Sequence, residues 1–379
     1  MKKKGLIISV GRSDYDRYFP ILKQLNQSKK IKTFIYLSSD HYEKKFGYSY
    51  KFVDKKFNII SNKTQISKKN KIENFTRDIF ALRKKIKAIQ PDFIVVLGDR
   101  YEMLIGPIIS IQQQIPLFHF YGGAVTEGSA DELVRHAISK MSHYHFVATN
   151  NYKKRLIQLG EEKWRIIVTG VLSLNNIKKE KFLTKKELSN FYNFNFFNPY
   201  ALLTYHPTTH ELQNLRSKIQ LILKSIKNKK LNLVVTYPNS DHKHETIIKF
   251  IEKNLKNKKG NLLIKNCGYK RYISLVKNSE FMIGNSSSGI VESATLKVPS
   301  LNIGSRQKGK IIPKNVVSCK YNEKDILRNI EKVHNKTFKK KLKKLKNPYE
   351  NNFKISNMPK IILKILKNKN LLKKKFKDF

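Results

Sequence analysis

Long apolar runs, clustered cysteines and acidic side chains are all scarce in this 379-residue chain. No stretch reaches the roughly 18 apolar residues that a membrane-spanning helix needs, and the apolar run at residues 5–10 is too short for a secretory signal. The two cysteines, Cys267 and Cys319, are isolated and have no histidine at the spacing of a metal site, which argues against a disulfide framework or a zinc module. We therefore expect a protein of the reducing cytoplasm without membrane insertion.

Motifs for bound cofactors are also missing. The chain has no G-x-G-x-x-G fingerprint of a nicotinamide or flavin site and no acidic cluster that would favour a metal. Residues 304–310 fit G-x-x-x-x-G-K, but Ile311 stands where a serine or threonine would bind Mg²⁺, and Pro313 opposes the helix that this motif requires. We expect neither a metal nor a nicotinamide or flavin cofactor.

Acidic residues are outnumbered by basic ones. The chain has 77 lysines and arginines against 28 aspartates and glutamates, a net charge of +49. Such a charge attracts anions in general, but the lysines are spread along the whole chain and no nucleic-acid module is recognisable. We interpret most of them as solvated helix faces. The alternative, a nucleic-acid binder, predicts an affinity that falls steeply with salt.

What the chain does have is an alternation of short apolar strands with amphipathic helices, in two series. The strands of the first series are expected at residues 6–10, 32–37, 93–97, 115–120, 144–149 and 166–170, and those of the second at 201–204, 231–236, 262–265, 281–283 and 298–303. This alternation is typical of parallel sheets covered by helices on both faces. It predicts an α/β protein with domains at 1–172 and 199–350, a connection at 173–198 and a C-terminal helix within 351–379.

Polar residues follow the strands at 93–97 and 115–120, where an open parallel sheet places its ligands. These strand ends and a helix start bring together the following residues: Asp99, Arg100, Glu127, Asp131, Arg135 and His136. Carboxylates can transfer protons and arginines can hold an anion. Arg12, just after the first strand, is placed to meet a phosphate. The alternative is ordinary polarity at strand ends.

Residues 284–292, Gly-Asn-Ser-Ser-Ser-Gly-Ile-Val-Glu, are the best candidate anion site in the second series. Small residues at a strand-to-helix turn offer backbone N–H groups and hydroxyls, with a helix dipole behind them. Glu292 can accept hydrogen bonds from a ribose diol. His206, which follows another strand, has either a ligand or proton-transfer role or a structural one. For the serines, the alternative is an ordinary helix N-cap.

Together these pieces resemble the family of hydrolysing UDP-N-acetylglucosamine 2-epimerases. The matching stretches are 11–15, 98–100, 122–128, 131–140, 206–209, 284–292, 304–307 and 347–349. They occur in the family's order along nearly the whole chain. The Val-Thr-Glu-Gly form at 125–128 is most similar to bacterial members that feed sialic and legionaminic acid synthesis.

The resemblance implies a glycosyltransferase-B type fold, in which two Rossmann-like domains face each other across a cleft and the last helix crosses back to the first domain. It also implies a homodimer and a reaction without metal or nicotinamide. A base removes the proton at C2 of the sugar while UDP leaves from C1, and water then adds to the glycal to release a free mannose-configured sugar.

The resemblance also assigns residues to roles. The catalytic candidates from the resemblance are Asp99, Asp131 and His206, and Glu127 is added because it lies three residues after Ala124. The candidates for substrate binding are Arg12, Arg100, Arg135, Asn239, Ser286, Ser287, Gly289, Glu292 and Arg306.

One position departs from the family in a way that bears on chemistry. The resemblance implies a glutamate acting as catalytic acid or base where this chain has Ala124. Losing such a group typically costs about 10²–10⁴ in rate. Two readings stay open: a hydrolysing 2-epimerase that works without this glutamate, and a non-catalytic or altered-specificity protein that binds nucleotide sugars. A glycosyltransferase of the same fold is a third, with less support.

Overall fold

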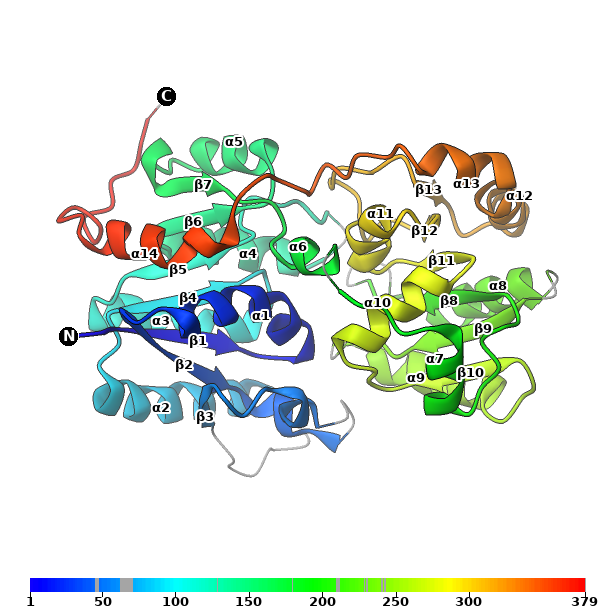
Figure 1. The fold of residues 1–379 in the computed structure, drawn as a ribbon, viewed down its shortest axis with the longest axis horizontal. Coiled ribbons are helices and arrows are strands. Elements are labelled where there is room, and N and C mark those ends of the chain that lie inside the picture. Colours follow the sequence, from blue (N-terminus) through cyan, green and yellow to red (C-terminus); the bar gives the residue numbers. More distant parts are fainter. Residues whose placement is uncertain are drawn as a thin grey trace. The chain divides into compact units, whose positions relative to one another are not determined.

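The chain folds into two compact units (Figure 1). The computed structural model describes residues 1–44, 48–61, 71–127, 129–178, 180–208, 212–227, 229, 231–239, 241 and 243–378. The first unit comprises Met1–Ala124, Asp131–Ser173 and Tyr349–Phe379, and the second comprises Val125–Ala130 and Leu174–Pro348. The prediction of two parallel-sheet α/β domains is confirmed.

The described part of the first unit contains a parallel sheet in the order β3-β2-β1-β4-β5-β6-β7. Its strands are β1 (Lys3–Ser9), β2 (Ile31–Leu37), β3 (Asn58–Ser61), β4 (Phe93–Leu97), β5 (Leu117–Phe120), β6 (Tyr144–Val147) and β7 (Ile166–Val168). Its helices are α1 (Arg12–Gln27), α2 (Lys71–Ile89), α3 (Ile105–Gln113), α4 (Asp131–Met141), α5 (Asn150–Gln158) and α14 (Met358–Leu366). All residues of β4, β5 and β6 are buried, including His119 of β5 and His145 of β6, as expected for strands covered on both faces.

The second unit repeats this plan with the strand order β10-β9-β8-β11-β12-β13. Its strands are β8 (Tyr200–Thr204), β9 (Asn232–Thr236), β10 (Asn261–Ile264), β11 (Phe281–Gly284), β12 (Ser300–Ile303) and β13 (Val316–Cys319). Its helices are α6 (Ser173–Ile177), whose first residue still belongs to the first unit, α7 (Lys185–Tyr192), α8 (Leu215–Lys227), α9 (His244–Leu255), α10 (Tyr269–Asn278), α11 (Glu292–Leu296), α12 (Glu323–His334) and α13 (Lys336–Leu342).

The strand order fixes where each unit can bind a ligand. In the first sheet β1 lies between β2 and β4, and in the second β8 lies between β9 and β11. At such a point the chain connections leave in opposite directions, and a crevice opens outside the carboxyl ends of the strands. Asp99 follows β4 and Asn285 follows β11. Each unit therefore places one of the predicted polar segments beside its own switch point.

Residues 173–198, which the sequence marks as a connection, contain α6 and α7, and from Leu174 onwards they belong to the second unit. A capping box explains α7. The Thr184 hydroxyl accepts from the Glu187 N–H at 3.2 Å, and the Glu187 carboxylate accepts from the Thr184 N–H at 2.7 Å.

The chain returns to the first unit after Pro348. The N–H of Val171 donates to the carbonyl of Tyr349 at 2.9 Å. Gly170 has a φ of +72°, and a Cβ there would lie 2.9 Å from the backbone nitrogen of Asn351, so only glycine allows this approach. Farther on, α14 packs against α1. The predicted crossing of the last helix back to the first domain is confirmed.

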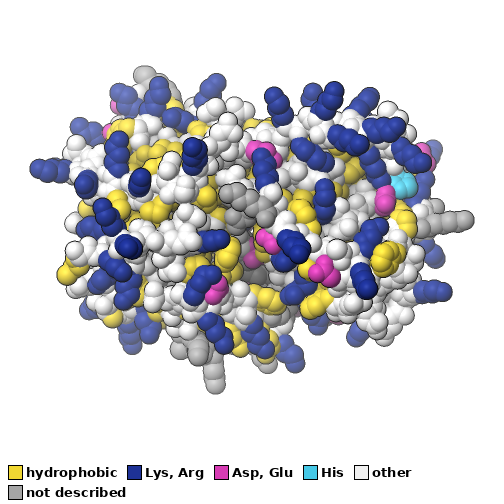
Figure 2. Space-filling view, in the orientation of Figure 1, with side chains coloured by type: hydrophobic (Ala, Val, Ile, Leu, Met, Phe, Trp, Pro, Cys, Tyr) yellow, Lys and Arg dark blue, Asp and Glu magenta, His cyan; other side chains and the backbone are white. Residues whose placement is uncertain are grey.

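Basic side chains are dispersed over the visible face of both units rather than gathered into one stripe (Figure 2). Among the described residues, no helix is both long and apolar enough to cross a bilayer.

Besides His145, the first unit buries three histidines whose pKa values lie far below the usual range. His41 and His119 are fully buried and His143 nearly so. Burial lowers the pKa of His41 and of His119 to about 3, and that of His143 to about 4. All three are therefore neutral in the folded protein at pH 5, whereas an unfolded chain would be protonated there, with a histidine pKa of about 6.5.

Acid should therefore weaken the first unit. The unfolded state binds more protons than the folded state below about pH 6.5, so the free energy of unfolding falls as the pH falls. Between pH 7 and pH 5 each buried histidine contributes a loss of about 2 kcal/mol. Urea unfolding of wild type and of a His41→Gln variant at both pH values measures this. The variant should lose less stability on acidification than wild type does, and a variant of the exposed His334 serves as the control. Equal pH dependence in all three proteins would contradict the account.

Candidate active site

Asp99 is held at the carboxyl end of β4 by a buried arginine from α4. Its Oδ2 accepts hydrogen bonds from Arg135, from Nε at 3.1 Å and also from Nη2. The Arg135 side chain is 1% exposed, whereas that of Asp99 is 33% exposed. A buried guanidinium thus fixes one oxygen of a carboxylate that still meets solvent. This arrangement orients a carboxylate for proton transfer.

Arg135 also organises its surroundings. Its Nη1 donates to the carbonyl of Ala124 at 2.9 Å and to the carboxylate of Glu132 at 2.6 Å. Burial disfavours the guanidinium charge, but Asp99 and Glu132 outweigh it, so the pKa of Arg135 lies above its usual value. Glu132 also contacts His136 Nε2 at 2.9 Å. Asp99, Ala124 and the first turn of α4, which Asp131 opens, therefore share one ion-paired cluster.

Arg100 is tied into a different set of carboxylates. Its Nε and Nη2 donate to Glu102 at 3.1 Å and 2.8 Å, and Nη2 also donates to Asp40 at 3.0 Å. Most of its charge is therefore matched within the first unit. Arg100 therefore ties the segment after β4 to Asp40, which follows β2. Its contact with a nucleotide stays a prediction.

Two predicted site residues need separate comment. Arg12 begins α1, but its side chain lies outside the described part of the structure. Glu127 belongs to the second unit, unlike Asp99 and Asp131. There its carboxylate pairs with Lys308 at 2.6 Å, and its side chain is 48% exposed. Its predicted part in catalysis stays a prediction.

In the second unit, His206 is buried at the carboxyl end of β8, and the Asn285 side chain hydrogen-bonds to its backbone N–H and carbonyl. The Asn285 side chain accepts from the N–H of His206 at 2.7 Å and donates to its carbonyl at 2.8 Å. On the ring, Nδ1 lies 3.2 Å from Asp241 Oδ2, and Arg306 Nη2 lies 3.7 Å from that same oxygen. The Asp241 carboxylate and the Arg306 guanidinium thus place one negative and one positive charge beside the ring. Asn239 is adjacent, with its N–H 3.4 Å from Nδ1.

The serine-rich turn after β11 differs from the sequence expectation in one respect. Ser287–Gly289 form a single 3₁₀ turn, capped by the Ser286 hydroxyl at 3.4 Å from the Ser288 N–H, and α11 then runs for only 5 residues. The predicted strand-to-helix turn is present, but so short a helix gives only a weak dipole, because the dipole sums over aligned peptide units. Hydroxyl and N–H donors, rather than a long helix, would have to bind an anion here.

Glu292 opens α11 and is 8% exposed. Within the described part of the chain, no donor lies within hydrogen-bonding distance of its Oε2, and the same holds for Oε1 of the buried Gln307. Gln307 Nε2 and Arg306 Nη1 both donate to the carbonyl of Asn285, at 2.8 Å and 3.2 Å. An unpaired buried carboxylate oxygen is costly, so Glu292 is suited to accept a hydroxyl hydrogen bond from a ligand.

Sequence reasoning missed several members of these clusters. Glu132, Asp241 and Asn285 each contact a predicted site residue, and Gln307 contacts Asn285. Asp241 and Gln307 each lie in a polar segment after a strand, the same signal that found His206 and Arg306. In the part of the chain that the structure describes, no group of three or more His, Cys, Asp or Glu side chains is placed to hold a metal ion.

Comparison with known proteins decides the family. A family described as UDP-N-acetylglucosamine 2-epimerase matches residues 23–367. The chain belongs to this family. Its predicted membership and its predicted type of enzyme, a 2-epimerase, are both confirmed.

Several relatives in this 2-epimerase family align over most of the chain. It is 37% identical to the GDP/UDP-N,N'-diacetylbacillosamine 2-epimerase (hydrolyzing) of Campylobacter jejuni, over 89% of each chain. It is 31% identical to the UDP-N,N'-diacetylbacillosamine 2-epimerase (hydrolyzing) of Legionella pneumophila, over 89% of this chain and 90% of the relative. It is 30% identical to the polysialic acid biosynthesis protein P7 of Escherichia coli, over 100% of this chain and 97% of the relative.

Among solved structures, the 2-epimerase fold is matched by UDP-GlcNAc 2-epimerase from Neisseria meningitidis, which was crystallised with UDP-GlcNAc. The TM-score is 0.80 at 20% identity, covering 96% of this chain and all of that one. At this identity the likeness concerns the fold, and it agrees with the predicted fold class.

Proposed function

We propose that this chain is a hydrolysing 2-epimerase that converts a UDP-linked 2-acetamido sugar into UDP and the free mannose-configured sugar. Membership of the 2-epimerase family and the hydrolysing relatives at 31% and 37% identity support the reaction type. The observation that carries the proposal is the carboxylate of Asp99, which a buried Arg135 holds by one oxygen at the end of β4.

The proposed chemistry has two steps. A carboxylate takes the proton from C2, the electron pair forms a C1–C2 double bond, and the C1–O bond to UDP breaks. Water then adds its hydroxyl to C1, while C2 receives a proton on the opposite face. We assign these proton transfers to Asp99 and Asp131. His206, whose Nδ1 lies 3.2 Å from Asp241, is proposed as a further catalytic residue, carried by the second unit.

The nucleotide is proposed to bind the second unit. Ser286 and Ser287 offer hydroxyl and N–H donors to the diphosphate, and Arg306 supplies a positive charge. The unpaired Oε2 of Glu292 is proposed to accept from the ribose. Asn239 and Gly289 complete this set, and the departing UDP is stabilised by donors already in place.

Replacing Glu292 tests the nucleotide site. Glu292→Gln should raise KM for the UDP-sugar and Kd for UDP by about 10-fold, because the charged acceptor of the ribose hydrogen bond becomes a weaker neutral amide oxygen, while kcat stays within two-fold of wild type. Glu331→Gln, an exposed glutamate of the same unit paired with Lys229, is the control. Calorimetric titration with UDP gives the answer, and an unchanged Kd would refute the assignment.

We propose a 2,4-diacetamido-6-deoxy sugar as the preferred substrate, because the relatives from Campylobacter jejuni and Legionella pneumophila are both named for diacetylbacillosamine. The product would then feed synthesis of a legionaminic-type acid. The polysialic acid relative supports a sialic acid branch instead. Purified protein should be offered the UDP-linked diacetamido sugar, its GDP-linked form and UDP-N-acetylglucosamine in turn, with the released nucleotide quantified. The highest kcat/KM on UDP-N-acetylglucosamine would overturn the substrate preference.

A second function is favoured by one observation. Ala124 stands where the family resemblance implies a catalytic glutamate, so a protein that binds nucleotide sugars without turnover is the alternative. Tight nucleotide-sugar binding with no release of UDP or GDP from any of the three donors would select it.

A further inference from the structure

The chain beyond α14 is a fixed part of the first unit. The Arg165 side chain, 1% exposed, donates to the carbonyls of Asn370 at 3.0 Å, Leu371 at 2.7 Å and Lys373 at 3.0 Å. The ring of Phe376 lies over Gly160, where a Cβ would approach it to 2.6 Å. A buried guanidinium bound to three carbonyls holds this segment in one place.

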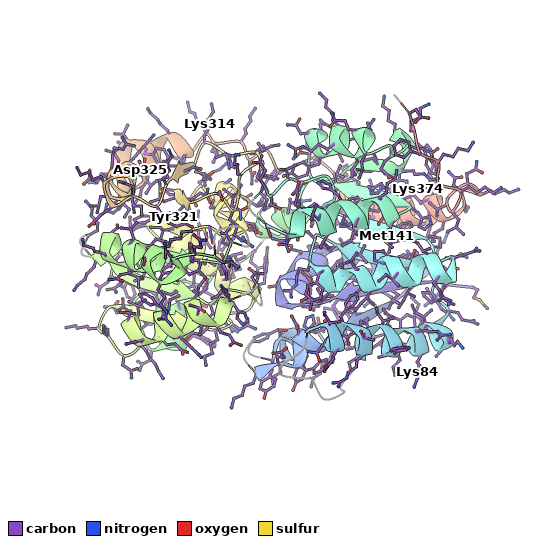
Figure 3. The ribbon with its side chains drawn as sticks, turned by 180° about the vertical axis from the view of Figure 1, so that it is seen from behind. Lys84, Met141, Lys314, Tyr321, Asp325 and Lys374 are labelled. Atoms are coloured by element: carbon purple, nitrogen blue, oxygen red, sulfur yellow. The ribbon has the colours of Figure 1, made fainter. Side chains whose placement is uncertain are left out.

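These contacts of Arg165 and Phe376 place Lys374 at the C-terminal end of α4. Figure 3 shows it near Met141. Its Nζ donates to the carbonyls of Lys140 at 2.5 Å, Ser142 at 2.7 Å and Ser139 at 3.4 Å. The last carbonyls of a helix have no partner within it and carry the negative end of its dipole, so an ammonium there is doubly favourable.

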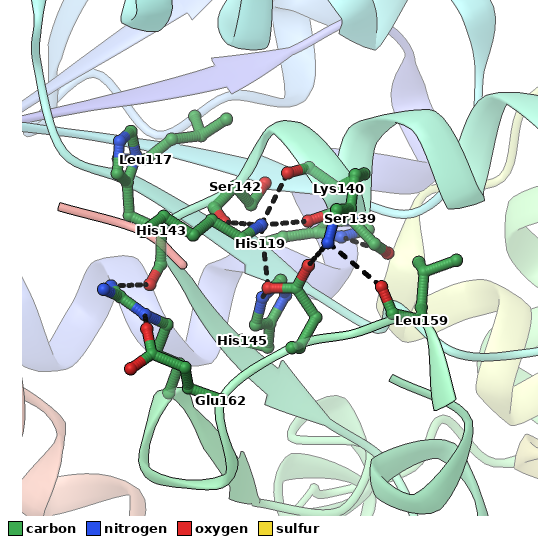
Figure 4. A network of polar contacts seen from close by, with 12 residues as sticks. Leu117, His119, Ser139, Lys140, Ser142, His143, His145, Leu159 and Glu162 are labelled. Atoms are coloured by element: carbon green, nitrogen blue, oxygen red, sulfur yellow. Dashed lines mark hydrogen bonds and ion pairs between the residues drawn. The ribbon is translucent and has the colours of Figure 1, made fainter. Parts of the chain in front are cut away.

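The surroundings of Lys374 keep its position well defined. Glu161, which is fully buried, lies 2.7 Å from Nζ and also contacts His145 at 3.0 Å and Lys140 at 3.3 Å. The Lys374 side chain is 15% exposed. Burial lowers the pKa of Lys374 to about 8, while the Glu161 charge acts in the opposite direction and Lys140 and Arg165 lower it further. The ammonium thus joins a network of polar contacts that includes Ser139, Ser142 and, through Glu161, His145. Figure 4 shows these three labelled residues close together.

Helix α4 is connected to Asp99 through two separate sets of contacts. Near its start, Arg135 binds the Asp99 carboxylate. Near its end, the Ser139 hydroxyl lies 3.1 Å from Nδ1 of His119, whose Nε2 lies 2.8 Å from the carbonyl of Gly98. Because the buried His119 is neutral, Nε2–H donates to that carbonyl and Nδ1 accepts from the hydroxyl. A shift of α4 along its axis would therefore move Asp99 through both contacts.

We propose that Lys374 is a positioning residue for catalysis: by binding the last carbonyls of α4, the C-terminal segment sets the position of that helix and, through Arg135 and His119, of the Asp99 carboxylate. This inference rests on the proposed function for its kinetic part. A misplacement of about 1 Å at a reacting group can cost about 10²-fold in rate, so the contact matters although Lys374 touches no substrate.

The kinetic test removes the ammonium and then restores it. Lys374→Cys should lower kcat about 10- to 100-fold and leave KM within two-fold of wild type, since the proposed nucleotide contacts lie in the second unit. Alkylation with 2-bromoethylamine rebuilds an ammonium of lysine length and should recover most of kcat. Both native cysteines are buried, which favours selective labelling. The control is Lys373→Cys, a neighbouring exposed lysine treated in the same way. Equal kcat in the two unlabelled variants, or no recovery after labelling, would overturn the proposal.

A second readout does not need turnover. Hydrogen exchange of the α4 amides should be about 10-fold faster in Lys374→Cys, as local opening becomes easier, while α9 in the second unit exchanges as in wild type. Unchanged exchange in α4 would refute the positioning role even if the enzyme were inactive on every donor. Faster exchange with an unchanged kcat would also refute it, because the contact would then be merely structural. Loss of wild-type turnover on all donors would instead count against the proposed function alone.

Discussion

Replacing Asp99 by asparagine is expected to lower kcat by about 10²–10⁴-fold, the usual effect of removing a positioned acid or base. Asparagine keeps an oxygen that can accept from Arg135, so the buried guanidinium retains a partner and also keeps Glu132. What is lost is the capacity to take up a proton. KM should change little, because the proposed nucleotide contacts are in the other unit.

The matched control for this variant is Glu132→Gln, which removes the other carboxylate from the same guanidinium. Both variants should lose similar stability, measured as the urea midpoint, since each takes one negative charge from a buried Arg135. Only Asp99→Asn should lose most of its turnover. If the two variants lost turnover equally, Asp99 would act as a counter-ion of Arg135, and its proposed role in proton transfer would fail.

Introducing glutamate at position 124 is expected to raise kcat by about 10²–10⁴-fold, the range typical of a general acid or base. Ala124 is 9% exposed, and its carbonyl is bound by Nη1 of Arg135, so its backbone belongs to the cluster that holds Asp99. A carboxylate on this backbone would supply the group that the family resemblance implies.

Ala124→Gln separates the effect of proton transfer from the effect of side-chain size. Glutamine has the size of glutamate but transfers no proton, so it should leave kcat at the wild-type value or below. Steady-state kinetics with the best of the three donors compares the three proteins. A wild-type rate already equal to that of Ala124→Glu would mean that the existing carboxylates suffice, and the proposed deficit at position 124 would be wrong.

The interior strands were predictable because each is a short, mainly apolar run. Phe93–Leu97 has the same bounds in sequence analysis and in the structure. Two edge strands were not predicted. Asn58–Ser61 has only four residues, two of them exposed and none buried, so it lacks the apolar pattern of an interior strand. Val316–Cys319 is equally short, with one exposed residue, and its pairing with β12 depends on the fold.

The sequence could predict which strand ends carry the candidate site residues, but not which of those residues bind one another. Asp99 and Arg135 are 36 positions apart, and only the packing of α4 on the sheet brings them together. The sequence suggests that Arg100 binds an anion. Only the structure shows that the carboxylates of Asp40 and Glu102 balance its charge. Local pattern identifies which residues reach the carboxyl edge of a sheet, whereas tertiary packing decides which of them bind each other.

The most direct test of the proposed function is the reaction in D₂O with the UDP-linked 2,4-diacetamido-6-deoxy sugar, followed by proton NMR. The two-step chemistry predicts UDP release in step with a free mannose-configured sugar whose C2 proton signal is missing, because C2 takes deuterium from solvent. A free sugar that kept its original configuration and its C2 proton would show simple hydrolysis and would contradict a 2-epimerase.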